Sequence, residues 1–235
     1  RHLKETMRDF AETQGTVPDL ITEVKNGIGG TYDFTYENST KFDNTGDDGI
    51  PHLPMNYKVC TRVEVNDGFV HKTATDDSYA KGYAYSAFVD GKKETDYFGF
   101  SEFTVTDGVG MKTVSSYNTV PYDDFRKNRA LAGAVKTSAT YGTDGKEYSR
   151  TDYDYTLHEV RENNTQPPSW LIEPTKVERY QQGTLVETRE AHISLSSSGY
   201  AINSRTDSVT DHYGSGQTVE SYSEFINNES TNEMR

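Results

Sequence analysis

The segment DYFGFSEFTVTDG, at residues 96–108, gathers the aromatic side chains Tyr97, Phe98, Phe100 and Phe103 within a polar chain. Rings gathered in this way could stack on sugars or nucleobases, or they could pack inside a sheet. A stacking platform usually exposes two or three rings on a polar surface, whereas these rings lie in an apolar run that ends at a turn. Because the chain is poor in leucine and isoleucine, we expect the rings to be buried.

Gly99 lies between two of these rings, and a glycine inside a strand often marks a β-bulge or a close backbone approach. In an unbroken strand Phe98 and Phe100 would share one face and Tyr97 would lie on the other. We therefore predict that the segment forms structural core, and the residues assigned to it are Tyr97, Phe98, Gly99, Phe100 and Phe103.

Residue types that carry out enzyme chemistry do not form a recognisable pattern in this sequence. The G-x-S-x-G elbow of serine hydrolases does not occur. The glycines of KNGIGGTYDF, residues 25–34, have the wrong spacing for a phosphate-binding loop. With 37 acidic residues, some carboxylate pair will meet the glycosidase spacing by chance. We predict no catalytic residue and no cofactor.

Metal-ligand patterns are also missing. No two of the histidines lie at a ligand spacing, and the histidines are His2, His52, His71, His158, His192 and His212. The acidic stretch FDNTGDDG, residues 42–49, resembles a calcium loop in composition but lacks the EF-hand register and its distal glutamate. Its alternative is a turn-rich polar loop. The single cysteine, Cys60, excludes an internal disulfide and a cysteine-based zinc site. We predict no metal.

Composition indicates an ordered but thinly packed β protein. Aromatic residues make up 12% of the chain, which argues against disorder, although mean hydropathy is only -0.84. Tyrosine, threonine and valine suit half-solvated sheets. The net charge of -13 disfavours nucleic acid and anionic membranes. No apolar run reaches the roughly 18 residues of a membrane helix. We expect no nucleic-acid partner and no membrane span.

Turn signals divide the chain into strands. An asparagine or aspartate followed by glycine favours the positive φ of tight hairpin turns, and this pair occurs at residues 26–27, 48–49, 67–68, 90–91, 107–108 and 144–145. Between these turns, polar and apolar residues alternate over 31–36, 57–65 and 152–157. We predict an all-β fold in which consecutive antiparallel hairpins form a curved or spiral sheet with little helix.

The pattern also predicts how the chain is divided. Residues 1–17 form a linker or a short helix, 18–162 the main β region, 163–174 a proline-rich connector, 175–226 further hairpins and 227–235 a polar tail. Pro167 and Pro168 forbid a regular ladder in the connector. The segment 123–133 could be a helix, a long loop or a continuing strand. Because the chain begins at Arg1 and has no signal-peptide pattern, we expect it to be a piece of a longer polypeptide.

Three segments carry a family resemblance. They are PDLITEVKNGIGGTYDFTYENSTKFDN at 18–44, YFGFSEFTVTDGVGMKTVSSYNT at 97–119 and SATYGTDGKEYSRTDYDYT at 138–156. Their order and spacing resemble the middle region of the B component of bacterial Tc insecticidal toxins and of SpvB-like RHS proteins. The resemblance covers residues 18–157, and the rest is similar only to YD-repeat hairpins. The sequence VPYDDFRKNRALAG, at 120–133, departs from the F-K-G motif of the family.

The resemblance implies a large hollow β-shell that encloses a toxic C-terminal polypeptide and docks onto a pore-forming partner, with the chemistry carried by other parts. We therefore expect a non-enzymatic structural segment of a secreted bacterial toxin. Its partners would be other segments of the same polypeptide, namely the RHS shell and the toxin cargo, and could include a pore-forming toxin component.

Two other functions stay open at this stage. A carbohydrate-binding β-sandwich would use exposed tyrosines and Trp170, so a covered Trp170 would count against it. A glycoside hydrolase fragment would need a cleft with two convergent carboxylates.

Overall fold

The structure is a computed structural model. It describes residues 20–46, 49–53, 55–69, 71–89, 91–119, 125–160, 169–195, 202–214, 216–225, 227–228 and 233–234. The predicted linker or helix at 1–17 therefore lies outside the described residues.

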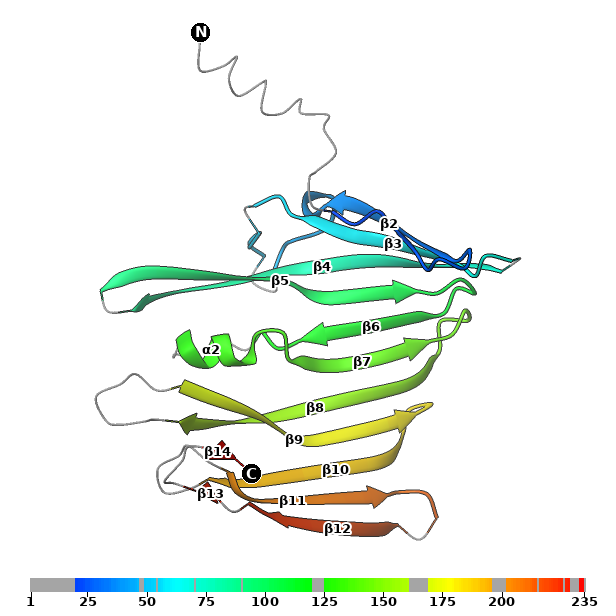
Figure 1. The fold of residues 1–235 in the computed structure, drawn as a ribbon. Helices are drawn as coiled ribbons and strands as arrows, with labels where there is room; N and C mark the ends of the chain where they lie inside the picture. The colour runs from blue at the N-terminus through cyan, green and yellow to red at the C-terminus, as the bar shows by residue number, and fades with distance from the viewer. Residues whose placement is uncertain are drawn as a thin grey trace.

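One open sheet of twelve strands forms the body of the protein, and its strands lie side by side in the order of the chain (Figure 1). The strands are β1 (Glu23–Lys25), β2 (Thr31–Asn38), β3 (Lys58–Asn66), β4 (Lys72–Val89), β5 (Lys92–Thr106), β6 (Lys112–Tyr117), β7 (Val135–Tyr141), β8 (Glu147–Val160), β9 (Ser169–Gln181), β10 (Thr184–Leu195), β11 (Ile202–Asp211) and β12 (Gln217–Glu224). Each neighbouring pair is antiparallel. The predicted all-β fold of consecutive antiparallel hairpins is confirmed.

The remaining elements in the described part of the chain are short. They are a 3-10 turn, η1 (Ser39–Lys41), a helix, α2 (Phe125–Leu131), and a two-stranded ribbon of β13 (Asn227–Asn228) and β14 (Glu233–Met234). Because the described long strands form one open sheet and not two packed sheets, the β-sandwich architecture of the carbohydrate-binding alternative is wrong.

Most of the predicted turn signals join paired strands. Between β5 and β6, for example, the backbone N–H groups of Val109 and Met111 donate to the Asp107 carboxylate at 3.0 and 2.9 Å. A turn without the predicted signal joins β9 to β10, where Gln182 and Gly183 have φ values of 48° and 78°. Two consecutive positive φ values are typical of a type I′ hairpin turn, whose twist matches that of the strands.

The boundary predicted near residue 174 differs from the structure. Strand β9 begins at Ser169, so the second half of the connector assigned to 163–174 belongs to the sheet, and its first half lies outside the described residues. Pro174 is tolerated inside β9 because it lies opposite Tyr155, next to a register shift that interrupts the ladder.

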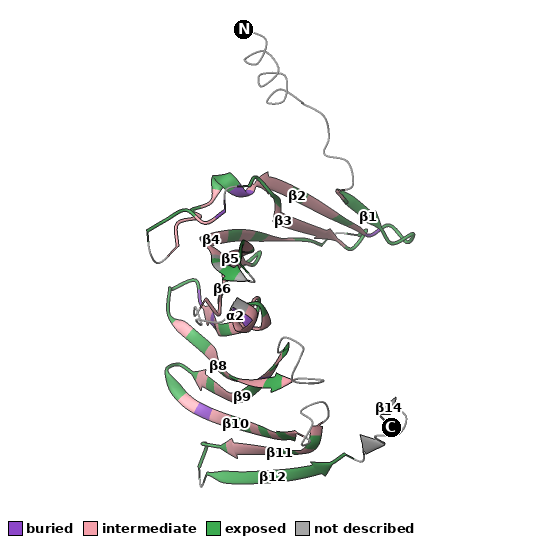
Figure 2. Cartoon of the chain, turned by 90° about the vertical axis from the view of Figure 1, so that its left-hand side faces the viewer, coloured by how far each residue is buried: buried purple, intermediate pink, exposed green. Residues whose placement is uncertain are grey.

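Burial is slight throughout the sheet, as the mainly pink and green ribbon of Figure 2 shows. Among the described residues, the buried hydrophobic side chains are Leu53, Leu131, Ala139 and Val186, and no large side chain is fully buried. The strands therefore make up a thin wall, and extra layers are confined to the few places where a connection folds back onto the sheet.

Strand length varies strongly in the middle of the sheet. The short strands β6 and β7 lie between two long hairpins, β4–β5 and β8–β9. Helix α2 belongs to the β6–β7 connection and lies between these long hairpins (Figure 1), where it contacts β4 and β9. Of the three possibilities for 123–133, the helix is the one observed. It ends before Gly133, whose φ of 80° suits a left-handed cap.

Candidate functional site

An aromatic cluster lies where the β2–β3 connection folds back onto the sheet. We call this connection, residues 39–57, the strap. The ring of Tyr79 in β4 is its centre, with centroids 5.4 Å from Phe100, 5.1 Å from Phe103 and 5.2 Å from Phe42 of the strap. These tilted and edge-to-face arrangements are the favoured geometries of aromatic pairs. The cluster is thus a small core with rings from three segments.

Backbone contacts hold the strap against β4. The N–H of Lys81 donates to the carbonyl oxygen of Asp43 at 2.9 Å. Within the strap, the Asn44 side-chain amide donates to the carbonyl of Leu53 at 3.0 Å. Leu53 is only 4% exposed. The approach is so close that a Cβ atom on Gly82 would lie 2.3 Å from the carbonyl oxygen of Asn44. Only glycine fits at this position.

A β-bulge at Gly99 directs the next rings. Tyr83 pairs with Gly99 and Ala84 pairs with Tyr97, so Phe98 is the extra residue of β5. Gly99 has a φ of 82°, which a residue with a Cβ rarely adopts. The Phe98 ring stacks on Tyr83 with centroids 5.1 Å apart. The bulge predicted from the glycine is therefore present.

The residues assigned to the core have two different environments. Phe98, Phe100 and Phe103 are half-buried and line one pocket. Tyr97 is 42% exposed and does not line that pocket, so its assignment to the core is wrong. The alternation of side chains along a strand is the physical reason, because it separates Tyr97 from Phe98.

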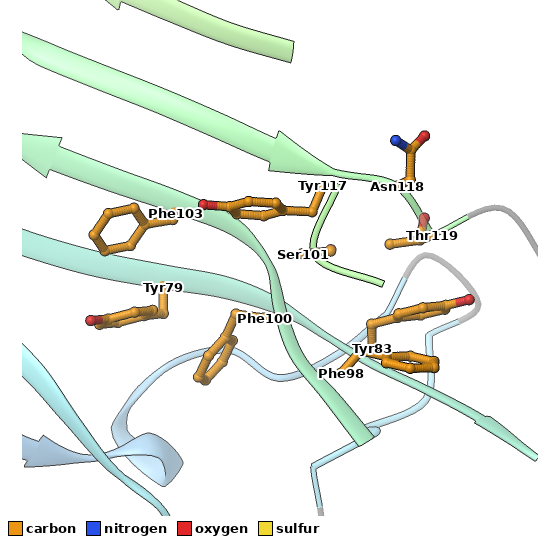
Figure 3. Close-up of a pocket in the computed structure, with 10 residues that line it drawn as sticks. Tyr79, Tyr83, Phe98, Phe100, Ser101, Phe103, Tyr117, Asn118 and Thr119 are labelled. Carbon is orange, nitrogen blue, oxygen red and sulfur yellow. The ribbon is translucent and has the colours of Figure 1, made fainter. Parts of the chain in front are cut away.

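The pocket has a volume of about 370 Å³ and is mainly aromatic. Its lining residues are Tyr79, Tyr83, Phe98, Phe100, Ser101, Phe103, Tyr117, Asn118, Thr119 and Gly133. Figure 3 shows Tyr79, Phe103 and Tyr117 at one end, Tyr83 and Phe98 at the other, and Phe100 between them. Ser101 is buried and its hydroxyl donates to the carbonyl of Lys81 at 3.0 Å. The pocket is therefore lined by six rings together with Ser101, Asn118, Thr119 and Gly133.

Tyr79, at the centre of the cluster, has a hydrogen-bonded hydroxyl and a raised pKa. Its hydroxyl donates to the carbonyl oxygen of Cys60 at 2.5 Å, and burial, with a smaller contribution from Asp77, raises the pKa of Tyr79 to about 12. Burial, and then repulsion by Asp76, raises the pKa of Asp77 as well. At neutral pH the phenol is therefore protonated and acts as a hydrogen-bond donor.

Helix α2 ties the two long hairpins together. Arg129 pairs with Asp96 and Glu94 of β5, the latter at 3.2 Å, and the Lys127 ammonium lies 4.4 Å from the ring centroid of Trp170 in β9. Trp170 is half-buried and one of its faces is covered by this lysine. The carbohydrate-binding hypothesis needs that ring to be open, so the structure counts against it.

A partly buried polar pair lies next to this contact. His158 Nε2 and Glu173 Oε2 are 2.6 Å apart, and Glu173 is 6% exposed. The other Glu173 oxygen and the indole N–H of Trp170 are buried without a hydrogen-bond partner. Across the residues that the structure describes, no group of three histidine, cysteine or acidic side chains could hold a metal ion.

The acidic stretch at 42–49 is described only in part. The Asp43 carboxylate accepts a hydrogen bond from the N–H of Thr45 at 3.0 Å, and this bond lowers the pKa of Asp43. Asp47 and Asp48 lie outside the described residues.

Sequence reasoning missed the partner rings of the cluster. Tyr79 and Tyr83 lie four residues apart in SYAKGYAY, a spacing that places both on one face of a strand, so a signal was present. Phe42 and Tyr117 come from separate segments, and no local pattern connects them with β5.

Comparison with known proteins identifies a family for this chain. The model of a family described as the insecticide toxin TcdB middle/N-terminal region matches residues 9–132, more than half of the chain. No curated protein matches the chain significantly. Within the described residues, no helix has both the length and the apolar character to cross a membrane. The family match confirms the resemblance to the middle region of the Tc toxin B component.

Proposed function

We propose, from the premise that this chain belongs to the insecticide toxin TcdB middle/N-terminal region family, that it is a non-enzymatic wall segment of a large secreted RHS-type toxin. In this proposal the sheet forms part of a β-shell that encloses or delivers a C-terminal cargo. Its partners are the other segments of the same polypeptide, the cargo and a pore-forming toxin component.

The observation that carries the proposal is that β12 is an unpaired edge strand of a sheet whose strands follow the order of the chain. All eight residues of β12 are exposed, and in the described structure β12 pairs only with β11. An unpaired edge strand offers N–H and C=O groups to another strand. Further hairpins of a longer polypeptide would extend the wall from this edge without changing the pattern of β1 to β12.

The small polar side chains in the middle of the sheet also support a wall. Thr113 and Thr140 approach within 3.3 Å through their hydroxyls, and Ser115 and Ser138 within 3.2 Å. Cross-strand hydroxyl pairs of this kind stabilise neighbouring strands without a second layer over the sheet, as a wall requires.

Hydrogen exchange tests the proposal in the intact toxin polypeptide. We expect the backbone amides of β12 to exchange at least about tenfold more slowly there than in the 235-residue chain, because a following strand pairs with them. Interior strand β8, paired on both sides over part of its length in the chain alone, is the matched control and should change little. Equal exchange of β12 in both proteins would contradict the proposal.

A further inference from the structure

Three neighbouring hairpin turns carry an apolar residue at their tip. They join β1 to β2, β3 to β4 and β5 to β6, and they lie at the right-hand rim of the sheet in Figure 1. Each is a five-residue loop in which the N–H of the first residue donates to the carbonyl of the fifth. The loops are 26–30, 67–71 and 107–111. Their third residues are Ile28, Phe69 and Val109, which are 82%, 85% and 74% exposed. We call these three side chains the apolar rim.

Hydrogen bonds within each loop fix the position of its tip. In every loop the N–H of the tip residue donates to the side-chain oxygen of the first residue, at 2.8 to 3.0 Å. The same oxygen accepts the N–H of the fifth residue at 2.9 to 3.3 Å. The first two loops also touch, since a Cβ atom on Gly68 would lie 2.6 Å from the carbonyl carbon of Gly29. A contact made by loops that are already ordered costs little conformational entropy.

The next loop at this rim shows that the turn itself does not require an apolar tip. Loop 142–146, between β7 and β8, closes with the same backbone hydrogen bond, from Gly142 to Lys146 at 2.9 Å. Its third residue is Asp144, a residue type that turns favour. Apolar side chains scattered singly over a surface are ordinary, but apolar side chains at the same position of three neighbouring loops form a patch. Such patches mark interaction sites.

We propose that the apolar rim packs against a second β-sheet of the same polypeptide, outside these 235 residues. Successive tips are two strands apart, which corresponds to about 9.6 Å. Another sheet repeats with the same period, so its alternate strands or its hairpin turns would meet the tips in register. This inference rests on the proposal that the chain is one segment of a longer polypeptide, and it names the surface through which the wall meets a further part of that polypeptide.

The size of the apolar rim favours a tethered partner. Three five-residue loops are fewer residues than the roughly 20–30 that each side of a stable complex contributes. A partner in the same polypeptide meets the rim at an effective concentration in the millimolar range, so a small contact is enough. The matched family is itself described as a region of a toxin. A lipid surface suits the rim less well, because Asp67 and Asp107 bring carboxylates into two of the loops.

Hydroxyl-radical footprinting tests the inference without any substitution. Oxidation of the three tip side chains is measured by mass spectrometry in the 235-residue chain and in the intact toxin polypeptide. We expect Phe69 to be oxidised at least about fivefold more slowly in the intact polypeptide, because residues at the core of an interface are fully buried. Equal oxidation of Phe69 in the two proteins would overturn the inference.

A matched pair of variants separates contact at the rim from folding of the chain. Phe69→Ser removes an apolar tip, whereas Asp144→Ser changes the corresponding residue of the polar loop. Both side chains are exposed, so we expect each variant of the 235-residue chain to unfold within about 2 °C of the unchanged chain. In the intact polypeptide, Phe69→Ser should speed cleavage by thermolysin at least about tenfold and Asp144→Ser less than about twofold.

Equal cleavage of the two variants would contradict the inference. If Phe69→Ser fails to fold as the isolated chain, Ile28→Ser repeats the comparison at the first loop, with the same expected contrast to Asp144→Ser.

Other occupants of the rim would give different results, and each would overturn the inference. Slower oxidation of Phe69 in the isolated chain as it dimerises, followed by analytical ultracentrifugation, would assign the rim to a second copy. Slower oxidation on addition of phosphatidylcholine vesicles would assign it to a lipid surface.

The same intact sample separates this inference from the wall proposal. Slow amide exchange of β12 together with unchanged oxidation of Phe69 would retain the wall and remove the rim contact. Slow oxidation of Phe69 together with unchanged exchange of β12 would retain the rim contact and remove the extension of the wall at β12.

Discussion

Strands β4 to β6 and strands β10 to β12 belong to the same sheet, yet they are stabilised in different ways. The first region carries the strap and the ring cluster around Tyr79. The second has no covering segment among the described residues, and its side chains Val219 and Tyr222 are 69% and 65% exposed. Many of its contacts are polar, such as Arg205 with Asp207 at 2.6 Å, although Val186 of β10 is buried.

The difference shows that the pairing of strands and the packing of a core are separate properties of this fold. Burial of apolar surface stabilises by about 25 cal/mol per Å², whereas exposed ion pairs contribute about 0–1 kcal/mol each. The region with the rings should therefore be the more stable part of the sheet, and the C-terminal strands should depend on what pairs with β12.

The largest expected effect comes from removal of a ring in the first region. Phe100→Ala should lower the free energy of unfolding by about 3 kcal/mol, because it opens a cavity beside Tyr79 and Phe42. Val219→Ala is the matched change in the second region and should cost less than about 0.5 kcal/mol. Urea unfolding of both variants measures the contrast, and similar losses would show that the two regions are equally packed.

An intermediate effect is expected where the strap meets β4. Gly82→Ala places a methyl group against the backbone of Asn44, so the strap must move, and we expect a loss of about 2 kcal/mol. Gly108→Ala, where the added Cβ would meet its nearest neighbour at 3.4 Å, is the control and should change stability by less than about 0.5 kcal/mol. Thermal unfolding and proteolysis within the strap distinguish the two. An unchanged Gly82→Ala variant would mean that the strap is not held against β4.

The smallest effect concerns the hydroxyl of Tyr79. Tyr79→Phe loses the hydrogen bond to Cys60 and should cost about 1 kcal/mol at neutral pH. Because the pKa of Tyr79 is raised to about 12, folding favours the protonated phenol, and stability is lost as the pH rises from about 10 through 12.

Unfolding midpoints between pH 9 and 12 test the alkaline part of this prediction. Tyr79→Phe should show a shallower decline than the unchanged chain, although Tyr155, whose pKa burial also raises, retains part of the slope. Parallel declines would remove Tyr79 as a source of the alkaline sensitivity.

Much of the sheet was predictable because its determinants are local. Turn dipeptides and the alternation of side chains act over a few residues. These local signals are enough to specify the pairing of consecutive antiparallel strands. The glycine between Phe98 and Phe100 even indicated the bulge, since its positive φ is a local requirement.

The predictions failed for different reasons. Tyr97 was assigned to the core although alternation places it on the other face from Phe98, and the prolines hid the start of β9 at Ser169, which pairs with Val160 at the end of β8. The site was missed in part because Phe42 and Tyr117 reach it from separate segments. Helix α2 is short, so its weak periodicity could not be told from a loop.

The strictly sequential order of β1 to β12 has a consequence for how the protein is made. Each strand meets its partner almost as soon as it is synthesised, which keeps contact order low for so large a sheet. Assembly can thus advance from the N-terminus during translation, one hairpin at a time, and no early strand has to wait for a late one.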